Sequence, residues 1–400
     1  MTMNFSESEE RGELRKAVAA LGKKYGHDYY LKQARTGGKT NELWDEAGRL
    51  GYLGVSVPEE YGGGGAGIGD LAAVCEEFAA AGTPLLLMVV SPAICATVIA
   101  RFGTDEQKKH WLPGFASGAV RMSFAITEPD AGSNSHRITT TASRDGGTGG
   151  PPANEGVAGG GWVLNGRKVY ISGVDEADAV LVVSRMEDAK TGKLKPALFI
   201  VPTDAPGFEF RQIEMDIVSA DKQFGLFLDD VKLPSDALVG SEDAAIAQLF
   251  AGLNPERIMG ASFSLGIARY ALDKGVAYAK ERNVWGTPIG AHQGLAHPLA
   301  QVKIELELAK LMTQKAAALY DSGDDFGAGE AANMAKYAGA EVAIHAVDQS
   351  VQVHGGNGLA SEYGLGTLIA AVRLGRIAPV SREMVLNFVG QHSLGLPKSY

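Results

Sequence analysis

One short run of the chain combines hydroxyls, carboxylates, a proline and a glycine directly after an apparent strand. Residues 121–126 have the composition of a strand, and Pro129 and Gly132 then turn the chain sharply. Such a turn leaves the hydroxyls of Thr127 and Ser133 and several peptide N–H groups outside any sheet ladder. Free donors of this kind suit an anionic or polar ligand. The residue types alone, however, are more often those of a surface turn.

A second group that could do chemistry is Glu256, in the run Asn254-Pro255-Glu256-Arg257. An asparagine cap, a proline at the first helical position and an acid in the first turn together predict that a long helix begins here. On residue types alone, Glu256 is a favourable helix-start residue. A carboxylate that is held close to a substrate and shielded from water could also act as a general base.

Several common catalytic signatures are missing from the sequence. It has no strand-linked G-x-G-x-x-G, no Walker loop, no H-E-x-x-H, no C-x-x-C and no G-x-S-x-G. His354 has no triad partners or metal-ligand neighbours in the sequence, and we expect no metal site. Nicotinamide, nucleotide-hydrolase, zinc and serine-hydrolase chemistry therefore lose their usual support.

Composition indicates a globular chain of two or three packed units, since 400 residues exceed the usual size of one hydrophobic core. A net charge of −10 argues against a nucleic-acid or anionic-membrane surface. Only Cys75 and Cys95 are present, which favours a reducing compartment, and the N-terminus lacks a signal-peptide pattern. We therefore expect a cytoplasmic location. The apolar run 84–100 is broken by proline and too short for a membrane span, so it predicts a buried helix pair.

The hydrophobic periodicity changes twice along the chain. It is helical to about residue 120, alternating from 121 to 236, and helical again from 237 to 400. This predicts an α+β protein of three domains: an N-terminal helical domain, a central antiparallel β domain and a C-terminal four-helix bundle. Strands are expected at 121–126, 138–143, 161–171, 178–185, 196–202, 207–213 and 224–232, and long helices at 255–283, 292–321, 326–353 and 366–391.

Two glycine-rich segments are predicted to be structural. The four glycines after Tyr61 could cradle a phosphate, but no Lys-Ser/Thr helix opening follows them, so a turn is favoured. The segment 145–161 is rich in Gly, Pro and Ala and is expected to be a flexible insertion.

The run from Phe124 to Asn134 resembles the first signature of the acyl-CoA dehydrogenase family, with Asn134 where the family usually has Asp. Three later segments, 166–173, 279–293 and 352–358, resemble other family segments in the same order. The resemblance extends from about residue 43 to residue 388. It implies the family's three-domain fold, non-covalently bound FAD, an acyl-CoA substrate and a homotetramer built as a dimer of dimers.

The resemblance also implies which residues bind FAD. Tyr170 stands where a Trp usually covers the flavin, and Ser172 stands where a Thr hydroxyl contacts the hydride-accepting nitrogen. The segments 279–293 and 352–358 are expected to reach the FAD of a neighbouring subunit. The full expected set is Phe124, Thr127, Ser133, Tyr170, Ser172, Arg282, Trp285, Gln293, Gln352, Gly355, Gly356, Ser381 and Glu383.

The resemblance assigns the catalytic base to Glu256. Most family members use a Glu near the C-terminus, but Pro379 occupies that position here. In isovaleryl-CoA and long-chain acyl-CoA dehydrogenases the base instead lies in a Glu-Arg pair that aligns with Glu256 and Arg257. Ser133 and Arg257 are expected to contact the substrate. Burial would raise the pKa of Glu256, whereas a helix N-terminus and Arg257 would lower it.

The implied reaction removes the α-proton of an acyl-CoA with Glu256 and transfers a β-hydride to flavin N5. The product is a trans-2-enoyl-CoA, as in fatty-acid β-oxidation, and an electron-transfer flavoprotein takes the electrons. Pro379 lacks the N–H that the family uses as a donor to the thioester oxygen. An acyl-CoA oxidase or related flavin enzyme is one alternative. A non-catalytic or hetero-oligomeric partner subunit is another, suggested by Pro379 and by Ala370-Ala371 in place of an Arg-Asp pair.

Overall fold

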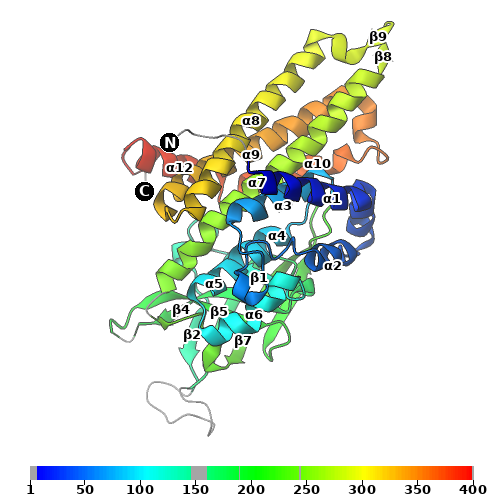
Figure 1. Cartoon of the computed structure of the whole chain (residues 1–400). Helices are drawn as coiled ribbons and strands as arrows, with labels where there is room; N and C mark the ends of the chain where they lie inside the picture. The colour runs from blue at the N-terminus through cyan, green and yellow to red at the C-terminus, as the bar shows by residue number, and fades with distance from the viewer. Residues whose placement is uncertain (1–6, 146–159, 189, 243–244, 399–400) are drawn as a thin grey trace.

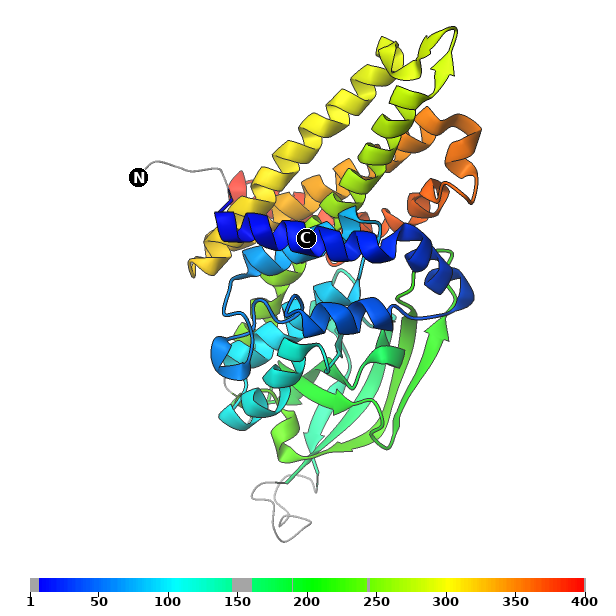
Figure 2. The ribbon, with the colours of Figure 1, turned by 45° about the vertical axis from the view of Figure 1, so that its right-hand side comes forward.

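A computed structural model describes residues 7–145, 160–188, 190–242 and 245–398. For residues 245–251 it describes the backbone only. Long helices form one end of the molecule, a β domain forms the other end, and the N-terminal helices pack between them (Figure 1). Figure 2 shows the same arrangement from another side, with helix α1 lying across the long helices. Most of the glycine-rich segment 145–161 lies outside the described residues.

The N-terminal helices follow the predicted pattern closely. Their bounds are α1 Glu9–Thr36, α2 Asn41–Arg49, η1 Glu59–Tyr61, α3 Ile68–Ala80, α4 Leu87–Val90, the π-helical turn η2 Ser91–Ala96, α5 Thr97–Phe102 and α6 Asp105–Ser117. Thr104 and Gln107 form a capping box at the start of α6. Gly62 and Gly65 have positive φ angles, as the predicted turn requires.

All seven predicted strands of the β domain are present: β1 Met122–Ala125, β2 Thr141–Arg144, β3 Trp162–Ser172, β4 Ala179–Glu187, β5 Leu194–Pro202, β6 Phe208–Ile213 and β7 Gln223–Leu233. The sheet order is β1-β4-β2-β3-β7-β6, with β5 paired to β4. The expectation of an antiparallel unit was wrong for part of the sheet, because β1 and β2 both pair with β4 in parallel. Neither β1 nor β2 is joined to β4 by a hairpin, because other strands lie between them in the chain, and such longer connections permit parallel pairing.

The C-terminal domain contains three long helices and several short elements. Helices α7 Ala245–Glu281, α8 Gln293–Asp321 and α9 Asp325–His354 pack side by side, and strands β8 Asn283–Val284 and β9 Thr287–Pro288 form the tip between α7 and α8 (Figure 1). The expected helix at 366–391 was wrong, because the chain leaves the regular α-helix at 372–373 and again at 378–381, where Pro379 lies. Its place is taken by η9 Leu365–Thr367, α10 Leu368–Ala371, α11 Leu374–Ile377, α12 Arg382–Phe388 and the π-helical η10 Val389–Ser393. The remaining short turns are η3 Ser135–Arg137, η4 Val174–Glu176, η5 Ser235–Ala237, η7 Ile289–Ala291 and η8 Gly355–Leu359.

Helix α7 also begins earlier than expected. Pro255 lies inside the helix, ten residues after its first residue, rather than at its start. A proline inside a helix removes one backbone hydrogen bond. Tertiary packing holds the helix together on both sides of Pro255: the Gly252 backbone lies against Ile94 and Val98, and Ile258 is fully buried. Glu256 is therefore in mid-helix, and the helix N-terminus cannot lower its pKa.

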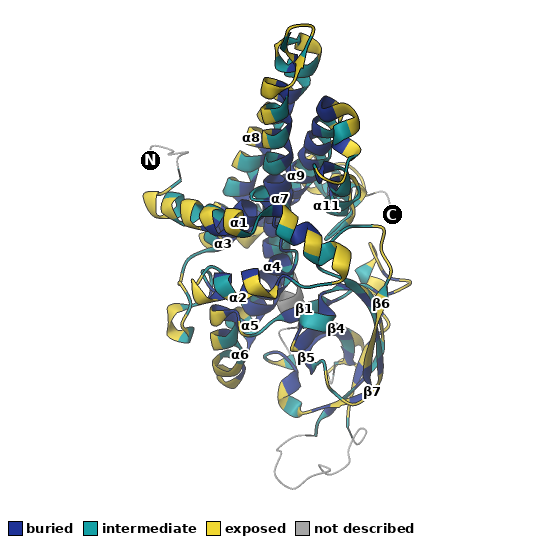
Figure 3. Ribbon diagram, turned by 90° about the vertical axis from the view of Figure 1, so that its right-hand side faces the viewer, coloured by how far each residue is buried: buried dark blue, intermediate teal, exposed yellow. Residues whose placement is uncertain are grey.

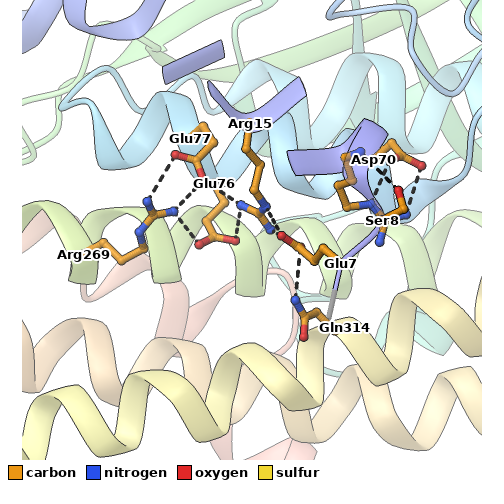
Figure 4. A network of polar contacts seen from close by, with 9 residues as sticks. Glu7, Ser8, Arg15, Asp70, Glu76, Glu77, Arg269 and Gln314 are labelled. Carbon is orange, nitrogen blue, oxygen red and sulfur yellow. Dashed lines mark hydrogen bonds and ion pairs between the residues drawn. The ribbon is translucent and has the colours of Figure 1, made fainter. Parts of the chain in front are cut away.

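Helix α7 is the central element of the fold, since it packs against α9, α3, α8 and η2. Figure 3 shows α7 and α9 mostly buried, while α8 keeps an exposed face. A buried ionic network joins α7 to the N-terminal helices (Figure 4). In it Arg15 of α1 lies 2.9 Å from Glu76 and 2.7 Å from Glu77 of α3, and Arg269 of α7 lies 2.7 Å from the same two carboxylates.

The apolar run 84–100 is buried, as predicted: Leu87, Met88, Ile94 and Val98 are all within the core. It forms the nearly continuous helical segment α4–η2–α5 instead of two separate helices. Within the described part of the chain, no helix is both long and apolar enough to span a membrane.

Candidate functional site

The loop after β1 is held as a tight turn beside strand β3. The backbone groups of Glu128 and Ala131 exchange two hydrogen bonds, of 3.2 and 3.1 Å. The Val169 N–H of β3 donates to the Thr127 carbonyl at 3.0 Å. This contact brings Thr127 next to the segment that carries Tyr170 and Ser172, as the sequence predicted. Ser133 lies exposed at the far end of the loop.

Tyr170 occupies a β-bulge with a φ of +58° and keeps 59% of its surface exposed. A positive φ is unusual for a residue with a bulky side chain and marks a constrained site. Between Lys168 and Ile171 the register of β3 against β7 shifts, so the Tyr170 ring points out of the sheet rather than into the core. An aromatic face is thereby available to a ligand beside Thr127.

Ser172 forms hydrogen bonds with residues of two other strands, β1 and β7. Its carbonyl accepts a hydrogen bond of 2.8 Å from the Ser123 hydroxyl of β1, and its hydroxyl lies 2.9 Å from Nε2 of Gln223 on β7. Phe124 is half-buried on β1 and packs against the core shared by β1, η2 and α6. The structure therefore brings together Phe124, Thr127, Tyr170 and Ser172, which the sequence placed in one site.

Glu256 is partly buried in the middle of α7. Burial raises the pKa of its carboxyl to about 7, although the charges of Arg257 and Lys336 act in the opposite direction. Arg257 is also partly buried, and its Nη1 donates to the Asn254 side chain at 3.3 Å. Lys336 of α9 is 2% exposed. A carboxyl with a pKa near neutrality can take up a proton at physiological pH, as a general base must.

Cys95, on η2, contacts strand β1 of the β domain. The Cys95 thiol lies 3.7 and 3.6 Å from the carbonyls of Met122 and Ser123 on β1, and the Ser91 hydroxyl accepts from the Met122 N–H at 3.0 Å. Burial raises the pKa of the Cys95 thiol well above its ordinary value, and the Glu256 charge adds to this effect. Helix η2 packs against both α7, which carries Glu256, and β1, which leads into the Thr127 loop, and the buried thiol is protonated and inert.

The C-terminal segment reaches the same turn of α7. A methyl group placed on Gly260 would lie 3.5 Å from the Pro379 ring, and Lys336 donates to the carbonyl of Val380. Ser381 caps α12 by accepting from the Met384 N–H at 3.3 Å. Glu383, in the first turn of α12, is one of the charges that act on Lys336. Ser381 and Glu383 therefore lie near Lys336, whose charge acts on Glu256.

The remaining expected FAD residues lie at the other end of the bundle. Trp285, at the tip between β8 and β9, is 89% exposed, and about 25 residues of helix separate Glu256 from this tip, or roughly 38 Å. The Tyr278 and His354 rings stack with centroids 4.2 Å apart, so the end of α9 lies beside the end of α7. Within one chain, therefore, Arg282, Trp285, Gln293, Gln352, Gly355 and Gly356 do not join the Glu256 site.

Three buried charges near the site were not singled out from the sequence. Glu128 is 4% exposed, Lys168 is 1% exposed and Lys336 is 2% exposed. In the sequence Glu128 is part of a turn motif, and Lys168 and Lys336 fall within an ordinary strand and helix pattern. A signal was available for Lys168: it falls on the inward side of an alternating strand, where a charge needs a partner.

The residues around Thr127 fit a flavin. The exposed Tyr170 ring offers a stacking surface, and the turn of 127–134 offers hydroxyls and peptide N–H groups to a pyrophosphate. Among the described residues, no group of three or more His, Cys, Asp or Glu is arranged to hold a metal ion. Cys75 and Cys95 are both buried and free.

Comparison with known proteins identifies the family. Three family models match the chain: acyl-CoA dehydrogenase N-terminal domain over residues 8–119, middle domain over 123–231 and C-terminal domain over 246–394. The chain is 67% identical to acyl-CoA dehydrogenase FadE12 of Mycobacterium tuberculosis over 99% of both proteins.

Solved structures of proteins in this family have the same fold as this chain. A glutaryl-coenzyme A dehydrogenase structure with glutaryl-CoA has a TM-score of 0.90 at 28% identity, covering 99% of this chain and 98% of that one. A glutaryl-CoA dehydrogenase of Mycobacterium smegmatis in complex with FADH2 has a TM-score of 0.88 at 26% identity, covering 98% and 96%. The chain therefore belongs to the acyl-CoA dehydrogenase family of FAD-dependent oxidoreductases.

Proposed function

We propose that the protein dehydrogenates an acyl-CoA thioester between its α- and β-carbons and that Glu256 removes the α-proton. The observation that carries this proposal is the environment of Glu256: a partly buried carboxyl with a pKa of about 7, next to Arg257 and Lys336. Carboxyls that burial shifts toward neutrality are typical of general bases. The helix α7 and the packing of η2 and α9 hold this side chain in place.

FAD, when bound, supplies the acceptor for the β-hydride. The chain's own groups would bind the cofactor and the substrate, orient them toward each other and exclude water from the site. We propose that Thr127 and Ser133 bind FAD with their hydroxyls, that Tyr170 covers the ring system and that Ser172 holds the edge of the flavin. Phe124, Ser381 and Glu383 would complete this part of the cofactor site, and Ser133 and Arg257 would contact the substrate. When an acyl chain displaces water beside Glu256, the proton acceptor becomes more basic.

We further propose that the distal residues act on the FAD of a neighbouring subunit in a homotetramer. The supporting observation is that the tip between β8 and β9 projects away from its own Glu256, and Trp285 there is 89% exposed. Arg282 and Gln293 flank this tip, and Gln352, Gly355 and Gly356 lie at the adjoining end of α9. We also propose an electron-transfer flavoprotein as the acceptor and the cytoplasm as the location.

Replacing Trp285 by alanine is expected to weaken FAD binding without unfolding the subunit. Because the side chain is 89% exposed, its removal costs little packing in one chain. We expect the FAD dissociation constant to rise about tenfold, the effect of losing one aromatic contact of about 1–1.5 kcal/mol. Equilibrium dialysis with FAD measures it, and Phe326→Ala, at another 88% exposed position, serves as the control.

The rate of substrate-dependent flavin reduction is expected to rise with pH through about 7. Only the ionised Glu256 can accept a proton, and burial sets its pKa near 7 in the folded protein. The acidic limb of kcat/KM should therefore have its midpoint close to pH 7. A limb near the ordinary carboxyl value of about 4.3 would contradict the environment described for this side chain.

Replacing Lys336 by methionine is expected to move that acidic limb to higher pH. Burial raises the pKa of Glu256, and the Lys336 charge partly offsets this effect by lowering it. Without the Lys336 charge, the pKa of Glu256 should therefore rise further. Lys336→Arg keeps the charge and should keep the limb near pH 7. pH–rate profiles of both variants measure the difference, and an unmoved limb in Lys336→Met would show that Lys336 does not act on the base.

The proposed activity is tested by anaerobic titration of the FAD-loaded protein with a panel of acyl-CoA thioesters. The expected result is bleaching of the flavin by at least one thioester and formation of its trans-2-enoyl-CoA. Admitting oxygen afterwards discriminates the alternatives: slow recolouring supports a dehydrogenase, and rapid recolouring supports an oxidase. No bleaching by any acyl-CoA would instead support the partner-subunit alternative.

A further inference from the structure

A buried ion pair lies directly behind the turn that follows β1. Lys168 of β3 and Glu128 of the turn are 1% and 4% exposed, and Nζ of Lys168 lies 2.9 Å from Oε1 of Glu128. Lys168 also donates to the carbonyl of Ile126 at 3.1 Å. One ammonium group therefore ties both the end of β1 and the turn to strand β3.

The Glu128 carboxylate gathers further bonds from the entry to β2. Its Oε2 accepts from the N–H and the hydroxyl of Thr139 at 2.6 and 2.8 Å, and its Oε1 accepts from the N–H and the hydroxyl of Thr140 at 2.9 and 2.6 Å. Burial opposes ionisation, but the bonds from Thr140 and Thr139 and the Lys168 charge lower the pKa of Glu128 to about 2. The side chain is thus an ionised carboxylate that joins the turn to the entry of β2 and to strand β3.

The position of this pair in the strand is informative. Val169, the next residue, donates its N–H to the Thr127 carbonyl, and Tyr170 follows in the bulge with its φ of +58°. The buried pair, the backbone bond and the exposed ring thus occupy three successive positions. Lys168 is therefore linked to the Thr127 turn by its own ion pair and by the neighbouring Val169 backbone bond, and Tyr170 lies two residues further along the same strand.

We propose that Glu128 and Lys168 are positioning residues that set the spacing between the Thr127 turn and Tyr170, and thereby the fit of the flavin between them. This inference rests on the proposed placement of FAD at Thr127 and Tyr170. Neither residue is expected to touch the cofactor, because both side chains point into the β domain. Buried, hydrogen-bonded charges confer specificity of conformation in some proteins, and here the conformation is that of a binding loop.

The test compares Lys168→Met, Glu128→Gln and the double variant with the wild type, using FAD binding and the visible circular dichroism of bound flavin. We expect the FAD dissociation constant to rise at least tenfold in each single variant and the flavin dichroism to change shape. The double variant removes both charges, so it should regain thermal stability lost in the single variants. It should not regain the wild-type affinity or dichroism, because the tie to Ile126 is gone.

Lys195→Met is the matched control, since Lys195 pairs with Asp188 at 3.0 Å on the distant β4–β5 hairpin of the same domain. It should leave FAD affinity and dichroism unchanged. If Lys168→Met does not fold, Glu128→Gln decides by the same two measurements. A double variant that binds FAD with wild-type affinity and dichroism would overturn the inference. Since no acyl-CoA is used, the result is separate from the test of Glu256 as the base.

Discussion

Replacing Glu256 by glutamine will lower the rate of flavin reduction by an acyl-CoA roughly 10²- to 10⁴-fold, the usual contribution of a positioned general base. Glutamine keeps the size of the side chain but cannot accept the α-proton. FAD should remain bound, because the proposed cofactor-binding groups of the Thr127 turn and of strand β3 do not include Glu256. Stopped-flow bleaching of the FAD-loaded variant under anaerobic conditions measures the rate.

Glu330→Gln provides the control for this variant. Glu330 lies on α9, where its carboxylate accepts from the Ser393 hydroxyl at 2.5 Å and is not among the charges that shift the pKa of Glu256. Its replacement removes one carboxylate from the same domain and should leave the bleaching rate within about twofold of wild type. Equal rates in Glu256→Gln and Glu330→Gln would rule out Glu256 as the base.

Replacing Arg15 by methionine will destabilise the fold by about 3 kcal/mol. Removing one partner of a buried ion pair typically costs about 3–5 kcal/mol. The lower end applies because Arg269 still lies 2.7 Å from both Glu76 and Glu77 (Figure 4). The network links α1, α3 and α7, so its loss also weakens the contact between the N-terminal helices and the helix that carries Glu256. Urea denaturation followed by far-UV circular dichroism measures the change.

Lys16→Met is the matched control for Arg15→Met. Lys16 is the next residue of α1, and its pair with Glu13 is mostly exposed, with 74% and 66% of the two side chains accessible. Exposed pairs contribute about 0–1 kcal/mol, so Lys16→Met should change stability little. A similar loss in both variants would show that burial of the network does not matter.

Much of the fold was predictable because its signals are local. Strand alternation placed all seven strands of the β domain, and the change of period separated them from the helices on either side. The Thr104 and Gln107 capping box was readable from four successive residues. The turn of 127–134 and the neighbouring Tyr170 and Ser172 were likewise found from short motifs, and the structure brings them together.

The errors arose where tertiary contacts override local preference. Pro255 looks like a helix start, yet packing around Gly252 and Ile258 extends α7 ten residues further back. Pro379 broke an apparent long helix, although the flanking pattern is amphipathic. The pairing of Glu128 with Lys168 joins residues 40 positions apart. No local sequence pattern specifies a contact between residues that are so far apart in the sequence.

The pKa of Glu256 could not be derived from the sequence for the same reason. The sequence predicts that a helix N-terminus lowers the pKa of Glu256, but this effect requires α7 to begin at Pro255. Tertiary packing determines where α7 begins. Lys336, which does oppose the shift, comes from another helix 80 positions away. The balance between burial and these charges exists only in the folded chain.

The central claim, that Glu256 removes the α-proton, is tested most directly by hydrogen exchange at the substrate. The FAD-loaded protein is mixed anaerobically with an acyl-CoA that bleaches it, in D2O, and deuterium at the α-carbon of recovered thioester is measured by NMR. The account predicts incorporation with the wild type and with Glu330→Gln, and none above the enzyme-free rate with Glu256→Gln. Deuterium entering at the wild-type rate with Glu256→Gln would contradict it.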